Sequence, residues 1–286
     1  MDEPLFLRLA DWLRREPVVL ASVIETRGAT PRKRGSRMLI ARDKAVFSIG
    51  GGLAEARVME AARGLLAAHS GAAALSIDLD GGQGAAGVCG GRMQITLRRW
   101  AGEADLALAE AIALQLQAGQ TAILPAQDEM PAQRLNPNPR LLIVGAGHCG
   151  QALYEHAQRL DFDIFVFDSR NECFADGTFG GASILRGGYA QLAAVMATQR
   201  TRCAVLLNRD FAADIATLDV LCREPPEFLG MMGSRRRIRQ VTDALPQYAR
   251  ALQRLQAPIG IDIDAETPHE IAISILAQVI GFLRNP

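Results

Sequence analysis

The feature that most constrains this chain is an apolar run that ends in a glycine-rich turn. Residues 141–150 read as a buried strand followed by the pattern G-x-G-x-x-G. Apolar residues then recur at helical spacing as far as Leu160, and a second strand, 162–167, ends at Asp168. This order predicts a βαβ unit whose glycines bring the backbone close to a pyrophosphate at a helix N-terminus.

Four residues of this unit are candidate nucleotide contacts. Gly145, Gly147 and Gly150 would form the turn, and Asp168, 18 positions after Gly150, would accept a ribose hydroxyl. An acid at this strand end favours an unphosphorylated ribose, although Arg170 is near enough in sequence to reach a 2′-phosphate. The alternative is a glycine turn that serves packing alone.

Strands continue to alternate with helices beyond this unit. The segment 140–286 therefore predicts a Rossmann-like domain, a parallel sheet with its ligand crevice at the strand ends. Gly233, Ser234 and Arg235 come at the start of a helix, where a glycine and a serine suit an anion. Arginines at that end oppose the helix dipole, and this mismatch favours a phosphate contact over a solvated face.

Two smaller features complete the second half. Thr267 and Glu270 have the spacing of a capping box, which predicts that the terminal helix begins there. Asp210, Asp214 and Asp219 follow one another at intervals of four and five. That spacing does not bring three oxygens together, so we interpret them as a solvated helix face and not as a metal cluster.

The first half, residues 1–125, predicts a mixed α/β domain, so the fold class is α/β with two different domains. Between two of its strands lies a loop, 27–35, that carries four cations, Arg32 among them. A solvated loop explains any one of these cations. As a cluster they could meet an anionic ligand.

A second loop of this half contains three consecutive glycines. Gly50, Gly51 and Gly52 join a strand to a helix, so their N–H groups could turn toward one anion at the positive end of that helix. Glu55 lies in the first helical turn, where a carboxylate also stabilises the helix dipole. The turn lacks the G-K-[ST] ending of a nucleoside triphosphate loop, which argues against an ATPase.

Cys89 is the candidate reactive thiol. It lies in a loop rich in glycine and alanine, and the glycines that follow it would let a bulky ligand or another sulfur approach. Cys149, Cys203 and Cys222 fit small buried hydrophobic positions. The five cysteines form no C-x-x-C pair, which is typical of a reducing compartment and offers no zinc framework.

Composition narrows the class of partner and the location. A formal net charge of zero argues against a general nucleic-acid or membrane-surface partner. We expect a cytoplasmic protein, because no apolar run is long enough to span a bilayer and no signal peptide is visible. The proline-rich segment 126–139 loses periodicity and predicts a linker between the domains. A homodimer is the expected assembly, because dimers are common.

Several of these passages, taken in order, resemble the XdhC/CoxI family, accessory proteins of molybdenum hydroxylases. The matching pieces are 26–32, 50–55, 89–91, 142–150, 233–235 and 258–274. The resemblance implies a chaperone that binds the molybdenum cofactor, a molybdopterin, and supports its sulfuration by a cysteine desulfurase. It also implies delivery to a hydroxylase, such as the large subunit of xanthine dehydrogenase.

The same resemblance implies roles for individual residues. Cys89 would contact the metal centre or its sulfur, the glycine turn at 50–52 and nearby arginines would hold the phosphate, and the second domain would bind a nucleotide. Leu53 stands where some members have a cysteine, which leaves Cys89 as the thiol candidate. Asn208-Arg209-Asp210 stands where many have Thr-His-Asp, so chemistry assigned to that histidine does not carry over.

Two other functions stay open. The glycine fingerprint by itself fits an NAD-dependent oxidoreductase, but no Ser/Tyr/Lys set and no His–carboxylate pair is evident to move a proton. The third hypothesis is an adaptor that tethers desulfurase to hydroxylase with its βαβ unit empty. We predict a maturation factor without catalytic residues, in which Gly147 and Cys89 face a common cleft.

Overall fold

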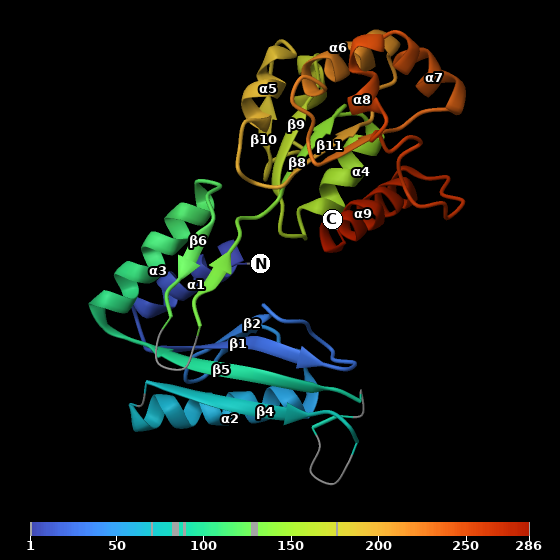
Figure 1. Ribbon diagram of the computed structural model, residues 1–286. Coiled ribbons are helices and arrows are strands. Elements are labelled where there is room, and N and C mark those ends of the chain that lie inside the picture. The colour runs from blue at the N-terminus through green and yellow to red at the C-terminus, as the bar shows by residue number, and fades with distance from the viewer. Residues whose placement is uncertain are drawn as a thin grey trace. The chain divides into compact units, whose positions relative to one another are not determined.

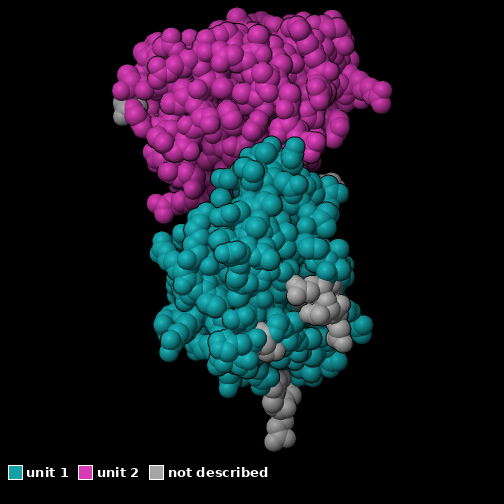
Figure 2. All heavy atoms as spheres, turned by 90° about the vertical axis from the view of Figure 1, so that its left-hand side faces the viewer, with its two compact units in different colours: residues 1–137 teal, residues 138–286 magenta. Residues whose placement is uncertain are grey.

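The chain folds into two compact units. The computed structural model describes residues 2–69, 71–81, 86–87, 90–126, 131–175 and 177–285. The units comprise residues 1–137 and 138–286 and are coloured separately in Figure 2. Each contains a five-stranded sheet with hydrophobic clusters of its own. The α/β class, with a mixed first unit and a Rossmann-like second unit, is confirmed.

Unit 1 is built on an antiparallel sheet with the order β3-β2-β1-β5-β4 (Figure 1). The strands are β1 (Val18–Arg27), β2 (Arg37–Ile40), β3 (Ala45–Phe47), β4 (Ala72–Asp78) and β5 (Arg92–Trp100). Strands β2 and β3 form a hairpin, with Met38 opposite Phe47. The long central pair, β1 and β5, carries the loops at 27–35 and 90–91 at one shared end.

Helices cover both faces of this sheet (Figure 1). They are α1 (Asp2–Leu13), α2 (Gly52–Ala68) and α3 (Gly102–Gln117). Val18 and Leu20 of β1 pack with α1 and α3, whereas Val19 and Ala21 pack with α2. Because β1 is buried on both faces, its sequence is a continuous apolar run and not an alternating one.

The proline-rich segment contains a strand that the sequence interpretation missed. Strand β7 (Gln133–Leu135) pairs antiparallel with β6 (Ala122–Leu124), and Leu135 is fully buried against α1 and α3. Three residues are too few to display an alternating pattern, so loss of periodicity was not a sign of irregular structure here.

Unit 2 has a parallel sheet with the order β10-β9-β8-β11-β12. The strands are β8 (Arg140–Val144), β9 (Asp163–Phe167), β10 (Ser183–Leu185), β11 (Arg202–Leu206) and β12 (Phe228–Met231). The order reverses between β8 and β11, so the crevice of this unit lies beyond the carboxyl ends of those two strands. The glycine turn follows β8 directly.

Two groups of helices sandwich this sheet (Figure 1). They are α4 (His148–Ala157), α5 (Ala190–Met196), α6 (Phe211–Leu221), α7 (Arg235–Asp243), α8 (Ala249–Leu252) and α9 (Pro268–Arg284), with 3₁₀ turns at 171–174 and 246–248. Leu141 and Ile143 of β8 pack with α4 and α9, whereas Leu142 and Val144 pack with α5 and α6. No helix among the described residues has the length and apolar character needed to cross a membrane.

The capping box at the start of α9 is confirmed. The Thr267 side chain accepts the Glu270 N–H at 3.3 Å, and the Glu270 carboxylate accepts the Thr267 N–H at 2.8 Å. These two bonds satisfy N–H groups that no helical carbonyl reaches.

Asp214 corrects the prediction of a solvated acidic face. Its side chain is fully buried and pairs with Arg237 of α7, whose Nε lies 2.9 Å from the carboxylate. Arg237 also donates to the carbonyl oxygens of Asn208, Arg209 and Asp210. One arginine therefore fixes the loop between β11 and α6 at the carboxyl edge of the sheet. The acidic spacing on α6 could not reveal a partner on another helix.

We expect Asp214→Ala to lower the free energy of unfolding by about 3–5 kcal/mol, because it leaves the largely buried Arg237 charge without a partner. Asp219→Ala is the control on the same helix, because its ion pair with Arg223 is solvent-exposed and its other partner is the neutral Tyr248 hydroxyl, 3.2 Å away. That control should cost at most about 1 kcal/mol. Urea unfolding measures the free energy of unfolding of both variants. Equal losses would contradict the role of the Asp214–Arg237 pair in fixing the loop between β11 and α6.

Candidate functional site

The glycine turn of unit 2 joins β8 to α4, and its three glycines have different surroundings. Gly145 has a φ of 111°, and a Cβ there would lie 2.9 Å from the carbonyl carbon of Leu207. A Cβ on Gly150 would lie 1.9 Å from the oxygen of Gly145. A Cβ on Gly147 would meet no heavy atom of the described residues within 4 Å. Gly145 and Gly150 therefore allow close backbone packing, whereas Gly147 faces open space.

Within the described part of the chain, no side chain caps the start of α4. Its first-turn N–H groups lack helical acceptors, and they lie at the positive end of the helix. Together with the open side at Gly147, this geometry is suited to an anionic group. Nucleotide binding at Gly145, Gly147 and Gly150 stays a prediction.

Asp168 is engaged within the chain. Its Oδ2 accepts the Ala146 N–H of the glycine turn at 2.9 Å, and its Oδ1 accepts the Arg170 N–H at 3.0 Å. The Arg170 guanidinium forms two further bonds to the same carboxylate, of 3.0 and 2.9 Å. Asp168 is only 5% exposed. A ribose hydroxyl would have to compete with these donors, so the ribose contact also stays a prediction.

The surroundings of Asp168 act on its pKa in opposite directions. Burial raises the pKa, but the hydrogen bonds from the Arg170 side chain and from two backbone N–H groups outweigh it, so the net pKa lies below its ordinary value. The Arg170 side chain remains 60% exposed. The cation at this strand end is therefore more accessible than the acid.

In the predicted anion contact at residues 233–235, the structure gives the serine a structural role. The Ser234 hydroxyl caps α7 by accepting the Arg237 N–H at 3.2 Å, so it serves the helix. Arg235 is exposed and has no acidic partner among the residues that the structure describes. An open hollow of about 330 Å³ lies beside α7 and is lined by Arg209, Phe211, Arg237 and Gln240. A phosphate contact at Gly233, Ser234 and Arg235 stays a prediction.

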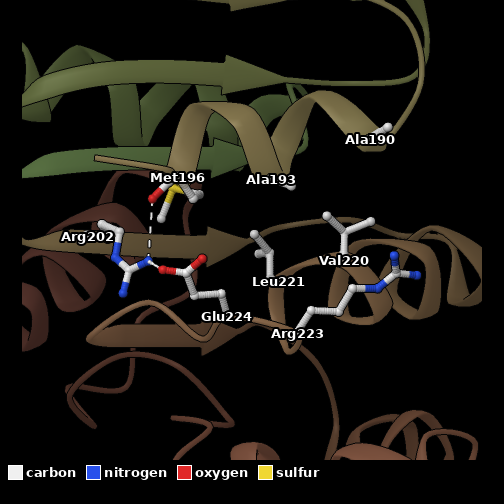
Figure 3. Close-up of a pocket in the computed structure, with 8 residues that line it drawn as sticks. All are labelled: Ala190, Ala193, Met196, Arg202, Val220, Leu221, Arg223 and Glu224. Carbon is white, nitrogen blue, oxygen red and sulfur yellow. Dashed lines mark hydrogen bonds and ion pairs between the residues drawn. The ribbon is translucent and has the colours of Figure 1, made fainter. Parts of the chain in front are cut away.

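A larger hollow of about 370 Å³ lies between α5 and α6 (Figure 3). Arg202, the first residue of β11, lines it, so the hollow lies at the amino edge of the sheet, opposite the glycine turn. The Arg202 guanidinium bonds to Glu224 at 3.2 Å and to the Met196 carbonyl at 3.4 Å. The Arg202 guanidinium that lines this hollow is therefore already hydrogen-bonded within the chain. We do not assign ligand binding to this hollow.

In unit 1 the three predicted ligand loops come together at one end of the sheet. The loop 27–35 touches both the segment 90–91 and the glycine turn at 48–52. A Cβ added to Gly28 would lie 2.8 Å from the Gly90 oxygen, and one added to Gly91 would lie 2.3 Å from the Ala29 oxygen. A Cβ added to Gly50 would lie 2.6 Å from Pro31 Cγ. Side chains at these glycines would separate the loops, so the sequence specifies their contact.

The glycine turn of unit 1 has the predicted shape, but it already holds an anion. Gly50, Gly51 and Gly52 have φ angles of 137°, 78° and 63°. Glu55 Oε2 accepts the Ile49 N–H at 3.3 Å, the Gly51 N–H at 3.0 Å and a neighbouring hydroxyl. The converging donors are thus filled by the chain's own carboxylate, and binding of an external anion there stays a prediction.

The cations of the loop 27–35 face solvent. Arg32, Lys33 and Arg34 are exposed, and none has an acidic partner among the described residues. Arg32 also lines a hollow of about 200 Å³ beside the glycine turn. This exposure fits both a solvated loop and an anion-binding cluster, so contact of Arg32, Lys33 and Arg34 with an anionic ligand stays a prediction.

Two residues that line this hollow were missed by the sequence interpretation. Arg37 is buried in β2, where it forms an ion pair with Asp2 and donates to Gln133 at 2.8 Å. Burial lowers its pKa, and Asp2 partly offsets this effect. Phe47 has a φ of 63°, unusual for a bulky residue, and is partly exposed. The signal available in the sequence was a charged residue, Arg37, directly before the apolar run 38–41.

Cys89 lies outside the described residues, so its contact with a metal centre and its common cleft with Gly147 stay predictions. Cys203 and Cys222 are buried as predicted, whereas Cys149 is only partly buried. Burial raises the pKa of Cys203 to about 12 and that of Cys222 to about 11. These two thiols stay protonated at neutral pH and are unreactive.

Both units match family-wide sequence profiles. Residues 12–78 match the XdhC and CoxI family, and residues 141–279 match the XdhC Rossmann domain. The chain belongs to the XdhC and CoxI family. The order of motifs in the sequence had already indicated this membership.

Individual relatives of this XdhC-family chain agree with the assignment. The uncharacterized protein YqeB of Escherichia coli K12 is 29% identical over 283 residues, covering 94% of this chain and 44% of YqeB. A probable xanthine dehydrogenase subunit from Bacillus subtilis is 28% identical over 149 residues, covering 52% of this chain and 44% of that protein. This chain thus spans less than half the length of either relative.

A solved structure shares the fold. The crystal structure described as a xanthine dehydrogenase from Bacillus halodurans matches with a TM-score of 0.82 and 22% identity. The match covers 98% of this chain and 96% of that one. At this level of identity it supports the architecture of the XdhC-family chain and not its activity.

The two departures from the family pattern, at Leu53 and at residues 208–210, both lie beside a candidate ligand-binding loop or hollow. Leu53 is 53% exposed in the first turn of α2, beside the glycine turn. Asn208 donates to Asp214 at 3.2 Å, and Arg209 is exposed beside the hollow at α7. In this XdhC-family chain the segment 208–210 is therefore a structural loop clamped by Arg237.

We expect Asp168→Asn to destabilise the protein by about 1–3 kcal/mol at neutral pH, because it removes a charged acceptor shared by four donors. A depressed pKa gives stability that is full above the unfolded pKa and is lost as pH falls through the folded pKa. Unfolding measured from pH 7 to pH 2 should therefore show the difference from wild type shrinking below about pH 4. Asp243→Asn, an exposed control, should show no such trend. A difference that stayed constant with pH would contradict this account.

We expect Glu55→Ala to cost about 1–3 kcal/mol, because the N–H groups of the glycine turn lose a charged acceptor. Glu60→Ala, an exposed site on the same helix, should change stability by about 0.5 kcal/mol or less. Inorganic phosphate should then raise the melting temperature of Glu55→Ala more than that of wild type, because the emptied turn offers free donors. Equal phosphate effects would show that the turn is not an anion site.

Proposed function

We propose that this XdhC-family protein is an accessory chaperone that binds the molybdenum cofactor, supports its sulfuration and delivers it to a molybdenum hydroxylase such as xanthine dehydrogenase. The convergence of three loops in unit 1 is the observation that carries the proposal. It gathers exposed cations, a glycine turn and the segment that follows Cys89 at one end of a sheet. Such a set suits a ligand with both a phosphate and sulfur-bound metal.

The residues present fit the phosphate end of this cofactor in a specific way. Because Glu55 fills the glycine turn, the phosphate would be held by Arg32, Lys33 and Arg34, with Arg32 at the mouth of the adjoining hollow of about 200 Å³. Long cationic side chains accept a phosphate without displacing the carboxylate. When bound, the cofactor would supply the molybdenum centre, and Cys89 would be its thiol contact.

Unit 2 would bind a nucleotide or the nucleotide part of the cofactor. The uncapped start of α4 and the open side at Gly147 support this assignment. We further propose a cysteine desulfurase and the hydroxylase as partners, a homodimeric assembly and a cytoplasmic location. The adaptor hypothesis predicts that the same partners bind while neither pterin nor nucleotide does.

An NAD-dependent oxidoreductase is the second candidate, favoured by the Rossmann order of the sheet and the glycine turn. The placement of acid–base groups argues against it. His269 lies 3.9 Å from Glu155, but this pair is at the far end of α4 from the turn. Along a helix of that length the separation is about 13 Å, too far to move a proton at the crevice.

The cofactor role is tested by purifying the full chain with molybdopterin and measuring bound pterin and the protection of its sulfurated form. We expect Cys89→Ala to retain the fold and to lose protection, because the thiol contact is removed. Cys222→Ala is the control, because that thiol is buried and protonated. If Cys89→Ala bound and protected the cofactor as well as wild type, the thiol role would be wrong.

A further inference from the structure

Two of the chain's four histidines lie together in unit 2, although 113 residues separate them in sequence. His156 is in the last turn of α4, and His269 is in the first turn of α9. The Nε2 of His156 lies 3.4 Å from the Nδ1 of His269, and the ring planes cross at 86°. The pair lies at the opposite end of α4 from the glycine turn of unit 2, and the proposed function makes no use of it.

We propose that His156 and His269 chelate a divalent transition metal of the zinc type. Imidazole nitrogens bind zinc at about 2.0–2.1 Å, so two of them at a tetrahedral angle lie about 3.3–3.4 Å apart. The observed separation of 3.4 Å, at which one ring donates a hydrogen bond to the other in the absence of metal, also matches this spacing. With Nδ1–H on His156 and Nε2–H on His269, both facing nitrogens present lone pairs while the imidazoles stay neutral.

The backbone positions of both ligands are fixed before any metal arrives. Helices α4 and α9 pack through one buried cluster, in which Leu153 lies with Ile275 and Val279. The capping box of Thr267 and Glu270 holds the first turn of α9, which carries His269. Chelation therefore requires only side-chain adjustment, which keeps its entropic cost low.

The surrounding charges favour a cation on balance. His156 lies at the C-terminal, negative end of α4, whereas His269 lies at the positive end of α9. The Glu155 carboxylate, 3.9 Å from the Nδ1 of His269, and the Glu270 carboxylate at the start of α9 offset the positive end. The Glu155 carboxylate is on the side of Nδ1, the nitrogen that would bind the metal, so it is placed to accept a hydrogen bond from a metal-bound water.

The inferred site has two protein ligands. Across the described parts of the chain, no three His, Cys, Asp or Glu side chains are arranged around a common metal position. Water would complete the coordination, and the 58% exposure of the His269 side chain leaves room for it. A metal held here would tie α9 to α4 and so stabilise unit 2. The inference does not rest on the proposed function, because neither candidate site shares these residues.

Zinc titration of the full chain, purified metal-free and reduced, tests the inference by calorimetry and by melting temperature. We expect one zinc ion to bind and to raise the melting temperature. His156→Gln and His269→Gln should each weaken binding by more than about tenfold, and Glu155→Gln by about tenfold as an outer partner. His69→Asn is the control, because His69 lies in unit 1 and asparagine tolerates its left-handed backbone.

The absorption spectrum of the cobalt-substituted protein distinguishes a histidine site from a site with cysteine ligands. Thiolate ligands give intense sulfur-to-cobalt charge-transfer absorption, which a site of histidine and water lacks. We expect a cobalt complex without that absorption, abolished in both histidine variants and retained in His69→Asn. Absence of binding, a thiolate spectrum, or affinity unchanged in His156→Gln and His269→Gln would each overturn the inference.

Discussion

Both glycine-rich turns of this protein are held by a carboxylate from the chain itself. Glu55 accepts two N–H groups of the turn in unit 1, and Asp168 accepts the Ala146 N–H of the turn in unit 2. In each unit an acid fixes the backbone where a ligand is expected. The N–H groups of the turns are consequently hydrogen-bonded within the chain, and an incoming anion must either compete with the carboxylate or use the cations beside it.

The cations beside the two turns are arranged for that second option. Arg32 is exposed beside the turn of unit 1, and the Arg170 side chain is 60% exposed next to Asp168. Arg237, in contrast, is committed to Asp214 and to three backbone carbonyls. Long exposed side chains can meet a phosphate at little structural cost, whereas a largely buried clamp cannot be released without unfolding its loop.

Particular elements show how far sequence reasoning reached. The strands and helices around Gly145 were predictable, because hydrophobic period and turn residues act over a few positions. Strand β7 was missed, because three residues carry no period. Asp214 was misread as solvated, because its partner Arg237 lies 23 residues away on another helix. The candidate loops of unit 1 were found one by one, but their contact depended on the pairing of β1 with β5.

The sequence by itself determined the class of fold, the βαβ unit, the capping box at Thr267 and the order of motifs that marks the family. Each depends on local periodicity, turn chemistry or motif order, which are written directly in the chain. Tertiary structure alone decided which acids fill the glycine turns, which arginine is a clamp, and that His156 meets His269. Those outcomes depend on how distant segments pack, and a carboxylate or an imidazole in a sequence does not specify its partner.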